Sequence, residues 1–491
     1  MKRPHLLIPL LAAVFALMPA CGTMAPKYAR PDAPVPGEWP AGAAYQKTEG
    51  NASAAKPADL EWRSFITDEK LRQVIETALA NNRDMRIAAL NVEKARTQYG
   101  LQRSALLPLV NAVASENRQS AMGVAGYAVV NRSSQVVPVV KRSITEVDSV
   151  SLGMASWEID FFGRIQSLKD AALQQYLATE QARRSAQIML ISSVATAYHA
   201  LAADQESLTL ANTTLETQQG IYQLVKRRFE GGVATDLDVQ RAQTQVDSAR
   251  GDAARYTQVA ALDKNALDFL VGAPVADTLL PGNLGAITPP VDIAAGTPSE
   301  VLLNRPDVLA SESVLKAANA NIGAARAAFF PRISLTAAVA TASNDLTGLF
   351  DPGTGVWTYA PQVALPVFDP RTWHAARLSK EEKKIAVAEY ERAIQSAFKE
   401  VADALAVHGT VDQQLAAQES LVGAVERAYK LSDLRYTKGM DSYLSVLDAQ
   451  RSVYAAQQGL VALRLAKLAN QIRLYAVLGG GWSASETTAK S

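Results

Sequence analysis

The chain has 491 residues, of which 48% are apolar and 20% are charged, so it is long and hydrophobic enough to fold around a substantial core. Its 49 Lys and Arg residues nearly balance its 48 Asp and Glu residues, which argues against a nucleic-acid partner. The single cysteine, Cys21, excludes an internal disulfide framework, and the four histidines lack the paired spacing of a metal site. We find no catalytic signature, and we expect no cofactor and no bound metal.

The chain opens with the three regions of a secretory signal. A positively charged start precedes an apolar run over residues 6–18, and a small residue stands directly before Cys21. We predict a signal peptide at residues 1–20 and lipidation of Cys21, as in bacterial lipoproteins; a free cysteine in a cleaved leader is the alternative. The proline-rich residues 21–60 predict an extended strap rather than a packed domain.

The rest of the chain is an internal duplication. Residues 161–272 align with residues 368–479 at a constant offset of 207, and residues 81–108 align with residues 304–331 at an offset of 223. The first repeat therefore carries 16 extra residues between its two blocks. The predicted organisation is a first repeat at 61–272, a connector at 273–298, a second repeat at 299–479 and a C-terminal tail at 480–491.

Each repeat begins with a helix and continues into two strands. Alternating apolar residues predict strands at 106–114 and 149–161 in the first repeat, and at 332–340 and 357–367 in the second. The first two strands are separated by a long polar segment, residues 115–148, which we expect to be a loop. In a membrane barrel this loop would form the larger extracellular cap.

A long helical hairpin follows the strands in each repeat. Residues 166–230 contain no proline and one glycine, and a helix of this length would extend roughly 98 Å. Residues 371–438 are their counterpart. The return segments, 233–271 and 440–478, contain one glycine each, so each pair is predicted to be two antiparallel helices joined by a very short loop.

Glycines mark the turn of each hairpin. Gly231 and Gly232 suit the end of the first long helix, and Gly439 suits the end of the second. Thr235 and Ser442 are the matching candidate N-caps of the return helices. These turns interrupt otherwise continuous helices, so we expect a partner protein to dock at them.

Four strands constrain the assembly. They cannot close a barrel by themselves, and open sheet edges are not stable in lipid. If the sheet faces a membrane, the chain must oligomerise to close it. A soluble sheet capping a helical stalk is the alternative. The predicted fold is mainly α with a membrane β-barrel part, in which long antiparallel coiled-coil-like hairpins accompany four amphipathic strands per chain.

Six stretches carry a family resemblance: WRSFITDEKLRQVIETALANN (62–82), WEIDFFGRI (157–165), VLLNRPDV (301–308), AAFFPRISL (327–335), LPVFDPR (365–371) and LRYTKGMDSYLSVLDAQRSVY (434–454). In this order they resemble the TolC-like outer-membrane efflux proteins, particularly the lipidated outer-membrane components of multidrug pumps. The resemblance extends from the lipoprotein-like start to Trp482.

The resemblance implies a homotrimer in which three chains close a 12-stranded barrel, continued into the periplasm by an α-helical tunnel. It implies a lipid-anchored duct in the cell outer membrane that passively exports drugs or other small molecules and catalyses no reaction. Its partners would be a periplasmic adaptor protein, an inner-membrane RND-type transporter and outer-membrane lipid. A type I secretion duct, a non-channel lipoprotein scaffold and an unrecognised envelope enzyme are the alternatives.

The resemblance also implies a gate on the return helix of the second hairpin. The constricting apolar and acidic positions of the family correspond to Leu444 and Asp448, whose spacing places them on one helix face. Latching contacts between neighbouring hairpins would involve Asp238, Tyr436 and Arg451. Alternatively, Asp448 merely pairs with Arg451 on an exposed helix, and Tyr436 is simple inter-helix packing.

Overall fold

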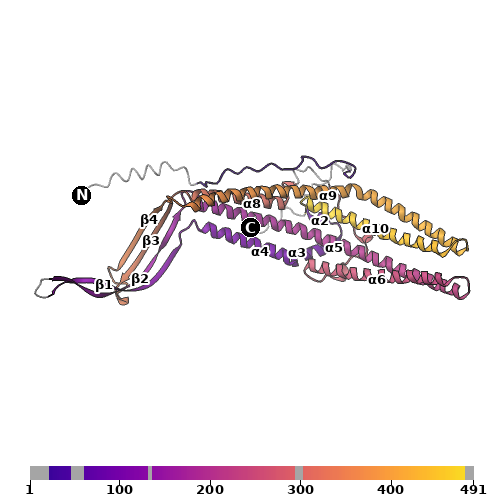
Figure 1. Cartoon of the computed structure of the whole chain (residues 1–491), viewed down its shortest axis with the longest axis horizontal. Coiled ribbons are helices and arrows are strands. Elements are labelled where there is room, and N and C mark those ends of the chain that lie inside the picture. The colour runs from indigo at the N-terminus through magenta and orange to yellow at the C-terminus, as the bar shows by residue number, and fades with distance from the viewer. Residues whose placement is uncertain (1–21, 46–59, 131–134, 294–301, 481–491) are drawn as a thin grey trace. The chain divides into compact units, whose positions relative to one another are not determined.

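A computed structural model of the chain describes residues 22–45, 60–130, 135–293 and 302–480, so the predicted signal peptide and Cys21 lie outside the described residues. The regular elements follow one another in this order (Figure 1): α2 Trp62–Phe65, α3 Glu69–Asn81, α4 Arg83–Ser104, β1 Val110–Val130, β2 Gln135–Ile159, α5 Arg164–Glu230, α6 Asp236–Val271, η2 Asp277–Leu279, η3 Leu284–Ala286, α8 Pro306–Ala327, β3 Arg332–Ser343, η4 Leu346–Gly348, β4 Gly355–Ala364, α9 Pro370–Thr437 and α10 Tyr443–Val477.

The described chain divides into two compact units, each with its own set of packed elements. Unit 1 comprises Met1–Arg30, Ala95–Tyr176 and Val314–Ala386, and unit 2 comprises Pro31–Lys94, Leu177–Ser313 and Val387–Ser491. Helices α4, α5, α8 and α9 contribute residues to both units. Unit 1 contains the sheet, and unit 2 contains both hairpin turns.

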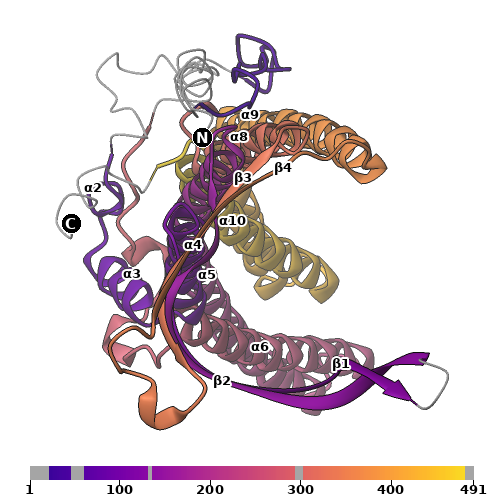
Figure 2. The same cartoon turned by 90° about the vertical axis from the view of Figure 1, so that its left-hand side faces the viewer.

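The four strands of unit 1 form one antiparallel sheet in the order β1-β2-β3-β4, as the alternating sequence pattern predicted. Figure 2 shows the strands side by side in a curved sheet. The register of β2 against β3 shifts between Met154 and Trp157, where Ser156 has a positive φ of 53°. A bulge of this kind bends a strand and increases its twist.

The loop predicted at residues 115–148 is wrong over most of its length. β1 extends to Val130 and β2 starts at Gln135, and the two strands remain paired from Val110↔Met154 to Val130↔Gln135. Because β3 pairs with β2 only from Asp148 onwards, this part of the hairpin is a two-stranded ribbon beyond the four-stranded sheet. The sequence prediction recognised strands by an alternating apolar face and therefore took this polar segment for a loop. A two-stranded ribbon with both faces open to solvent can form without such an apolar face.

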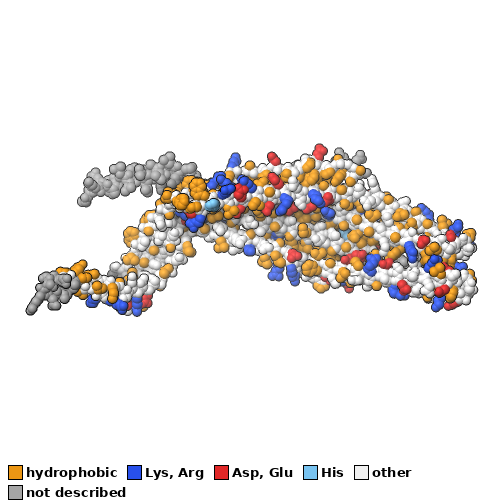
Figure 3. All heavy atoms as spheres, viewed as in Figure 1, with side chains coloured by type: hydrophobic (Ala, Val, Ile, Leu, Met, Phe, Trp, Pro, Cys, Tyr) orange, Lys and Arg blue, Asp and Glu red, His pale blue; other side chains and the backbone are white. Residues whose placement is uncertain are grey.

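Large apolar side chains cover the sheet and remain exposed in the single chain. Trp357 is 77% exposed and Val363 66% exposed on β4, and Figure 3 shows many hydrophobic side chains along the strands. Among the described strands, β1 pairs only with β2 and β4 pairs only with β3, so one edge of each outer strand has no partner. A soluble single-chain sheet would normally cover both the apolar surface and the edges.

The two hairpins of unit 2 confirm the long helices expected from the sequence. α5 has 67 residues and returns through α6, and α9 has 68 residues and returns through α10 (Figure 1). Among the described helices, α5 is long and apolar enough in one stretch to cross a membrane, but 61% of that stretch is buried inside the chain. Such burial is typical of a core helix.

The main core of unit 2 packs the short helices α2 and α3 against the long ones. Phe65 stacks on Tyr475 of α10 with ring centroids 3.8 Å apart, and the Tyr475 hydroxyl donates to the Leu60 carbonyl over 2.6 Å. His199 of α5 is 1% exposed in this region, and burial lowers the pKa of its imidazole to about 4. The ring is therefore neutral at neutral pH, which suits a core position.

Equivalent hydrogen bonds are made to a carbonyl near the end of the return helix in each repeat of unit 2. In the first repeat, the Asn82 side chain donates to the Leu270 carbonyl near the end of α6 over 2.8 Å. In the second, Arg305 donates to the Val477 carbonyl at the end of α10 over 2.8 Å. Asn82 and Arg305 are related by the 223-residue offset, and Leu270 and Val477 by the 207-residue offset. Both repeats thus satisfy the same unpaired carbonyl of a helix terminus.

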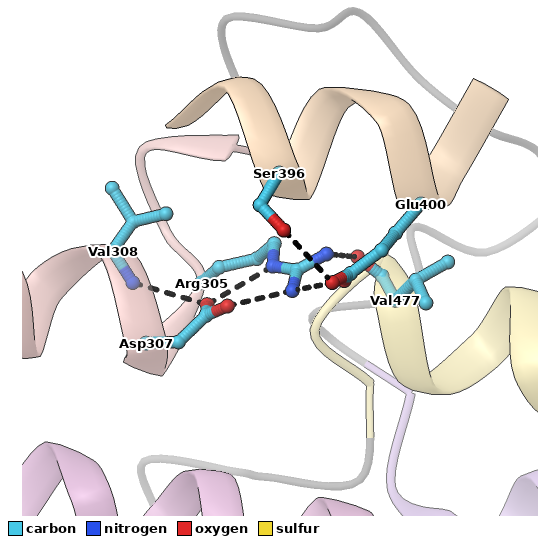
Figure 4. Close-up of polar contacts among 6 residues, drawn as sticks. All are labelled: Arg305, Asp307, Val308, Ser396, Glu400 and Val477. Atoms are coloured by element: carbon cyan, nitrogen blue, oxygen red, sulfur yellow. Dashed lines mark hydrogen bonds and ion pairs between the residues drawn. The ribbon is translucent and has the colours of Figure 1, made fainter. Parts of the chain in front are cut away.

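Arg305 makes more contacts than its counterpart (Figure 4). Its guanidinium forms two hydrogen bonds to Asp307, of 3.0 and 2.7 Å, and one of 2.8 Å to Glu400 of α9. The side chain is only 8% exposed, and the two carboxylates compensate for its burial and keep the pKa of the guanidinium high. One residue therefore links the start of α8 to α9 and α10.

We predict that Arg305→Ala lowers the free energy of unfolding by about 1 to 3 kcal/mol, because it removes the donor to the Val477 carbonyl and the cationic partner of Asp307 and Glu400. Denaturant titration followed by circular dichroism measures the change. Arg371→Ala is the matched control, since it removes a similar two-bond contact with Asp369 from a side chain that is 91% exposed. The control should leave the free energy of unfolding essentially unchanged, because an ion pair of an exposed side chain contributes little; equal effects would contradict a structural role for the Arg305 network.

Candidate functional site at the hairpin tips

The two hairpin turns have the same backbone geometry. Gly232 and Gly439 lie in the left-handed region, with φ of 69° and 74°. After each glycine, the next amide donates back to the last turn of the long helix: Val233 to the Arg228 carbonyl over 2.8 Å, and Met440 to the Arg435 carbonyl over 2.9 Å. A residue with a Cβ costs roughly 1–2 kcal/mol in this conformation, so these two positions require glycine.

The starts of the return helices differ. Thr235 and Asp238 form a reciprocal capping box at the start of α6, as expected for Thr235. Ser442 at the start of α10 makes no side-chain cap, which corrects the prediction for this residue. Asp441 acts there instead: its carboxylate accepts from the Ser442 amide over 2.9 Å and from the Ser445 hydroxyl over 3.1 Å.

The charge at the second tip is stabilised locally. Asp441 also pairs with Arg435 over 3.2 Å. The bond from the Ser442 amide, then that from Ser445 and the Arg435 partner lower the pKa of the Asp441 carboxyl. Around these turns, large apolar side chains remain exposed, including Val233 at 71% and Met440 at 64%. A polar turn framed by exposed apolar side chains has the composition of a protein-docking surface.

A small buried cluster joins the two hairpins near their tips. Tyr443, Val446 and Leu447 of α10 pack with Val225 of α5 and Val239 of α6. Burial raises the pKa of the Tyr443 hydroxyl, so this group is neutral throughout the physiological range. The cluster therefore holds the hairpins together mainly by apolar packing.

Tyr436 lies at the border of this cluster. Its ring lies 5.4 Å from that of Tyr443, and the Arg228 guanidinium sits over its face at 4.9 Å from the centroid. A cation above an aromatic face adds an electrostatic attraction to the packing. Arg228 and Tyr436 come from different hairpins, so this contact also bridges them.

A short ladder of polar contacts continues the link between the hairpins. Arg451 of α10 donates from Nε to the Gln245 side-chain oxygen of α6 over 3.1 Å. Gln218 of α5 donates to Gln450 of α10 over 3.2 Å, and Gln450 donates to the Tyr429 hydroxyl over 3.1 Å. Separating the two hairpins would break the Arg451–Gln245 and Gln218–Gln450 bonds, whereas the Gln450–Tyr429 bond lies within the second hairpin.

The structure brings the predicted gate residues and the predicted latch residues to one region near the hairpin tips. Within this chain, Tyr436 and Arg451 each contact the other hairpin. Leu444 and Asp448 are both exposed on α10, and within the described residues the Asp448 carboxylate makes no hydrogen bond or ion pair. Asp238 bonds within its own capping box, and Arg451 bonds to Gln245. The alternative of a simple Asp448–Arg451 pair is not formed in this chain.

Sequence reasoning missed Gln245 and Gln218, because a glutamine on a long polar helix carries no signal of its partner. The duplication offered one indication: Gln450 is repeated as Gln243, yet Gln243 bonds to Asp247 on its own helix. Within the described ranges, no group of three or more His, Cys, Asp or Glu residues could hold a metal ion.

Comparison with known proteins places this arrangement in a family. The family described as "Outer membrane efflux protein" matches residues 74–273 and 297–480, which include the sheet and both hairpins. The chain belongs to this family. Its lipidation site, gate and docking residues are not identified by the match and remain predictions.

Several relatives are similar over nearly the whole chain. The toluene efflux pump outer membrane protein TtgC of Pseudomonas putida is 44% identical, over 96% of this chain and 95% of the relative. The outer membrane protein OprJ of Pseudomonas aeruginosa is 40% identical over similar shares, 96% and 95%. The open state of the MtrE outer membrane channel of Neisseria gonorrhoeae has a TM-score of 0.82 at 35% identity, covering 94% of this chain and 98% of that one.

We predict that Arg451→Ala and Gln245→Ala each raise the open probability of the reconstituted protein to the same extent, because they remove the two ends of one hydrogen bond. The loss of about 1 kcal/mol corresponds to roughly a fivefold change in the ratio of open to closed states. Single-channel recording measures this ratio. Arg250→Ala, which removes an arginine paired with Asp247 within α6, should leave it unchanged; unequal effects of the two main variants would show that this bond is not a latch.

Proposed function

We propose that the protein is the outer-membrane exit duct of a tripartite efflux pump. The observation that carries the proposal is the combination, in one chain, of a four-stranded sheet with two unpaired edges and two helical hairpins whose long arms have 67 and 68 residues. Such an arm extends about 100 Å. A duct uses both features, since the strands cross a membrane and the helices extend the passage into the periplasm.

The open edges support a trimer. In lipid, an unpaired strand edge leaves backbone groups without hydrogen-bond partners at a cost of several kcal/mol each, so the edges of β1 and β4 must pair between chains. Three chains would contribute 12 strands, an even number within the usual range for outer-membrane barrels. A lipoprotein scaffold would need the helices but has no use for an apolar, open-edged sheet.

The hairpin tips are the proposed docking surface for a periplasmic adaptor, which would connect the duct to an inner-membrane RND-type transporter. Gly232 and Gly439 fix the shape of the tips, Gly231 directly precedes Gly232, and all three are exposed. The exposed Val233 and Met440 supply the apolar part of the contact. The relative named for toluene efflux suggests small apolar molecules as the class of cargo.

The strap after Cys21 supports a lipid anchor at this residue. The Thr23 and Ser167 hydroxyls lie 2.6 Å apart, and Asn319 donates to the Pro26 carbonyl over 2.8 Å. A Cβ on Gly323 would come within 2.5 Å of the Ala25 amide nitrogen, so the strap lies closely against α8. These contacts, all within unit 1, hold the residues directly after Cys21 next to the helix that leads into β3.

The experiment is planar-bilayer recording of the purified, lipidated protein. We predict a poorly conducting, cation-selective channel, because three converging copies of Asp448 attract cations and Leu444 disfavours wetting. Asp448→Asn should reduce the cation selectivity. Asp247→Asn, which neutralises an exposed acid paired with Arg250 on α6, should not. Absence of any conductance would contradict the duct, and equal selectivity in all three proteins would place the constriction elsewhere.

A further inference from the structure

A groove lined by cations and aromatic rings lies in unit 1, where α8 ends and α9 begins. Figure 3 shows hydrophobic side chains gathered beside blue ones at the junction of strands and helices. One cavity here, of about 530 Å³, adjoins a second of about 430 Å³ that is lined mainly by apolar atoms. The first is lined by Arg326, Phe329, Trp373, His374, Ala376, Arg377 and Lys380; the second shares Arg326 and Phe329 and adds Met24 and Phe330.

The cations of the first cavity lack acidic partners. Within the described chain, Arg326, Arg377 and Lys380 form no ion pair, and Arg326 makes only a 3.3 Å hydrogen bond to the Met24 carbonyl. Neighbouring cations outside the cavity are paired: Arg371 with Asp369 and Lys384 with Glu381. The groove therefore concentrates positive charge that the protein itself does not neutralise, and it favours an anionic ligand.

The aromatic rings place this ligand at a membrane boundary. Phe329 and Trp373 meet edge to face with centroids 5.8 Å apart, and Trp373 is nevertheless 70% exposed. Exposed tryptophan and phenylalanine beside basic residues are typical of the interface between lipid and water. The cavity also lies just beyond the strands, because β3 begins at Arg332 and β4 ends at Ala364.

The strap identifies the lipid-facing side of this groove. Met24 lines the second cavity, and it lies three residues after Cys21 in the sequence. If Cys21 carries an acyl anchor, this face must meet the membrane rather than the interior of the duct. The argument therefore rests on the proposed function, in which the strands span the outer membrane.

We propose that this groove binds the headgroup of an anionic phospholipid from the periplasmic leaflet of the outer membrane. The phosphate contacts Arg326, Arg377 and Lys380, since guanidinium and ammonium groups donate several charge-assisted hydrogen bonds to phosphate oxygens. One acyl chain follows Phe329 and Phe330 into the apolar second cavity. The groove thus has a charged part and an apolar part that match the two parts of a phospholipid.

The test uses Trp373 as a built-in probe. The lipidated full-length protein is reconstituted into phosphatidylcholine vesicles containing brominated phosphatidylglycerol or, as a comparison, brominated phosphatidylcholine. Bromine quenches nearby indoles, and subtraction of the Trp373→Phe signal isolates this residue from the other five tryptophans. We expect stronger quenching by phosphatidylglycerol. Each cation removed should reduce the preference about fivefold, as expected for one basic residue beside an anionic lipid surface.

Two sets of variants separate a site from general surface charge. Arg326→Gln, Arg377→Gln and Lys380→Gln, singly and together, should progressively abolish the preference. Arg371→Gln and Lys384→Gln, which remove neighbouring cations that already have acidic partners, should preserve it. Equal losses in both sets would overturn the proposal.

Three further outcomes would also overturn the site. If inorganic phosphate displaces the lipid at equal concentration, the groove is a site for free phosphate. If neither brominated lipid quenches Trp373, a second copy of the chain covers the groove. Equal quenching by both lipids in vesicles that conduct ions would reject the lipid site while leaving the duct intact, whereas vesicles without conductance would reject the duct as well.

Discussion

The unpaired edges of one four-stranded sheet determine how the whole protein can be built. β1 and β4 each leave one edge without a partner among the described strands, and lipid offers no water to satisfy it. Oligomerisation removes both edges at once. In the proposed trimer it would also bring together three copies of every hairpin, so the proposed constriction at Leu444 and Asp448 would exist only in the assembly. The proposed gate would therefore depend on backbone hydrogen bonding in the sheet, which lies far from it along the chain.

The two repeats satisfy the unpaired carbonyl at the end of their return helices with different side chains. Each return helix ends beside the start of its own repeat, and Asn82 or Arg305 satisfies an equivalent carbonyl there. The second repeat adds an ion-pair network around Arg305, whereas the first relies on a neutral amide. At the tips the asymmetry continues, since Thr235 caps α6 while Asp441 replaces the expected Ser442 cap on α10. The two hairpins are therefore held at both ends by different polar contacts.

Much of the fold could be predicted from the sequence, because periodicity and chain breakers are local signals. The proline-free segments predicted the long helices, and Gly232 and Gly439 predicted the turns that end them. The ribbon formed by residues 115–130 and 135–148 could not be predicted, since its pairing depends on cross-strand hydrogen bonds rather than on an apolar face. The partner of Arg451 was also hidden: which of several polar side chains it contacts depends on how α6 and α10 pack.

The most direct test of this account is disulfide cross-linking between sheet edges in a Cys21→Ser background. Each variant carries two cysteines in the same chain, one among Asn111–Val113 of β1 and one among Thr358–Ala360 of β4. Within one chain these strands are three strand spacings, or about 14 Å, apart, which is too far for a disulfide. We predict bonds only between chains, giving a covalent species of three chain masses on non-reducing denaturing gels. No cross-link at any pairing, a product that stops at two chains, or a bond within one chain would contradict barrel closure by β1–β4 pairing.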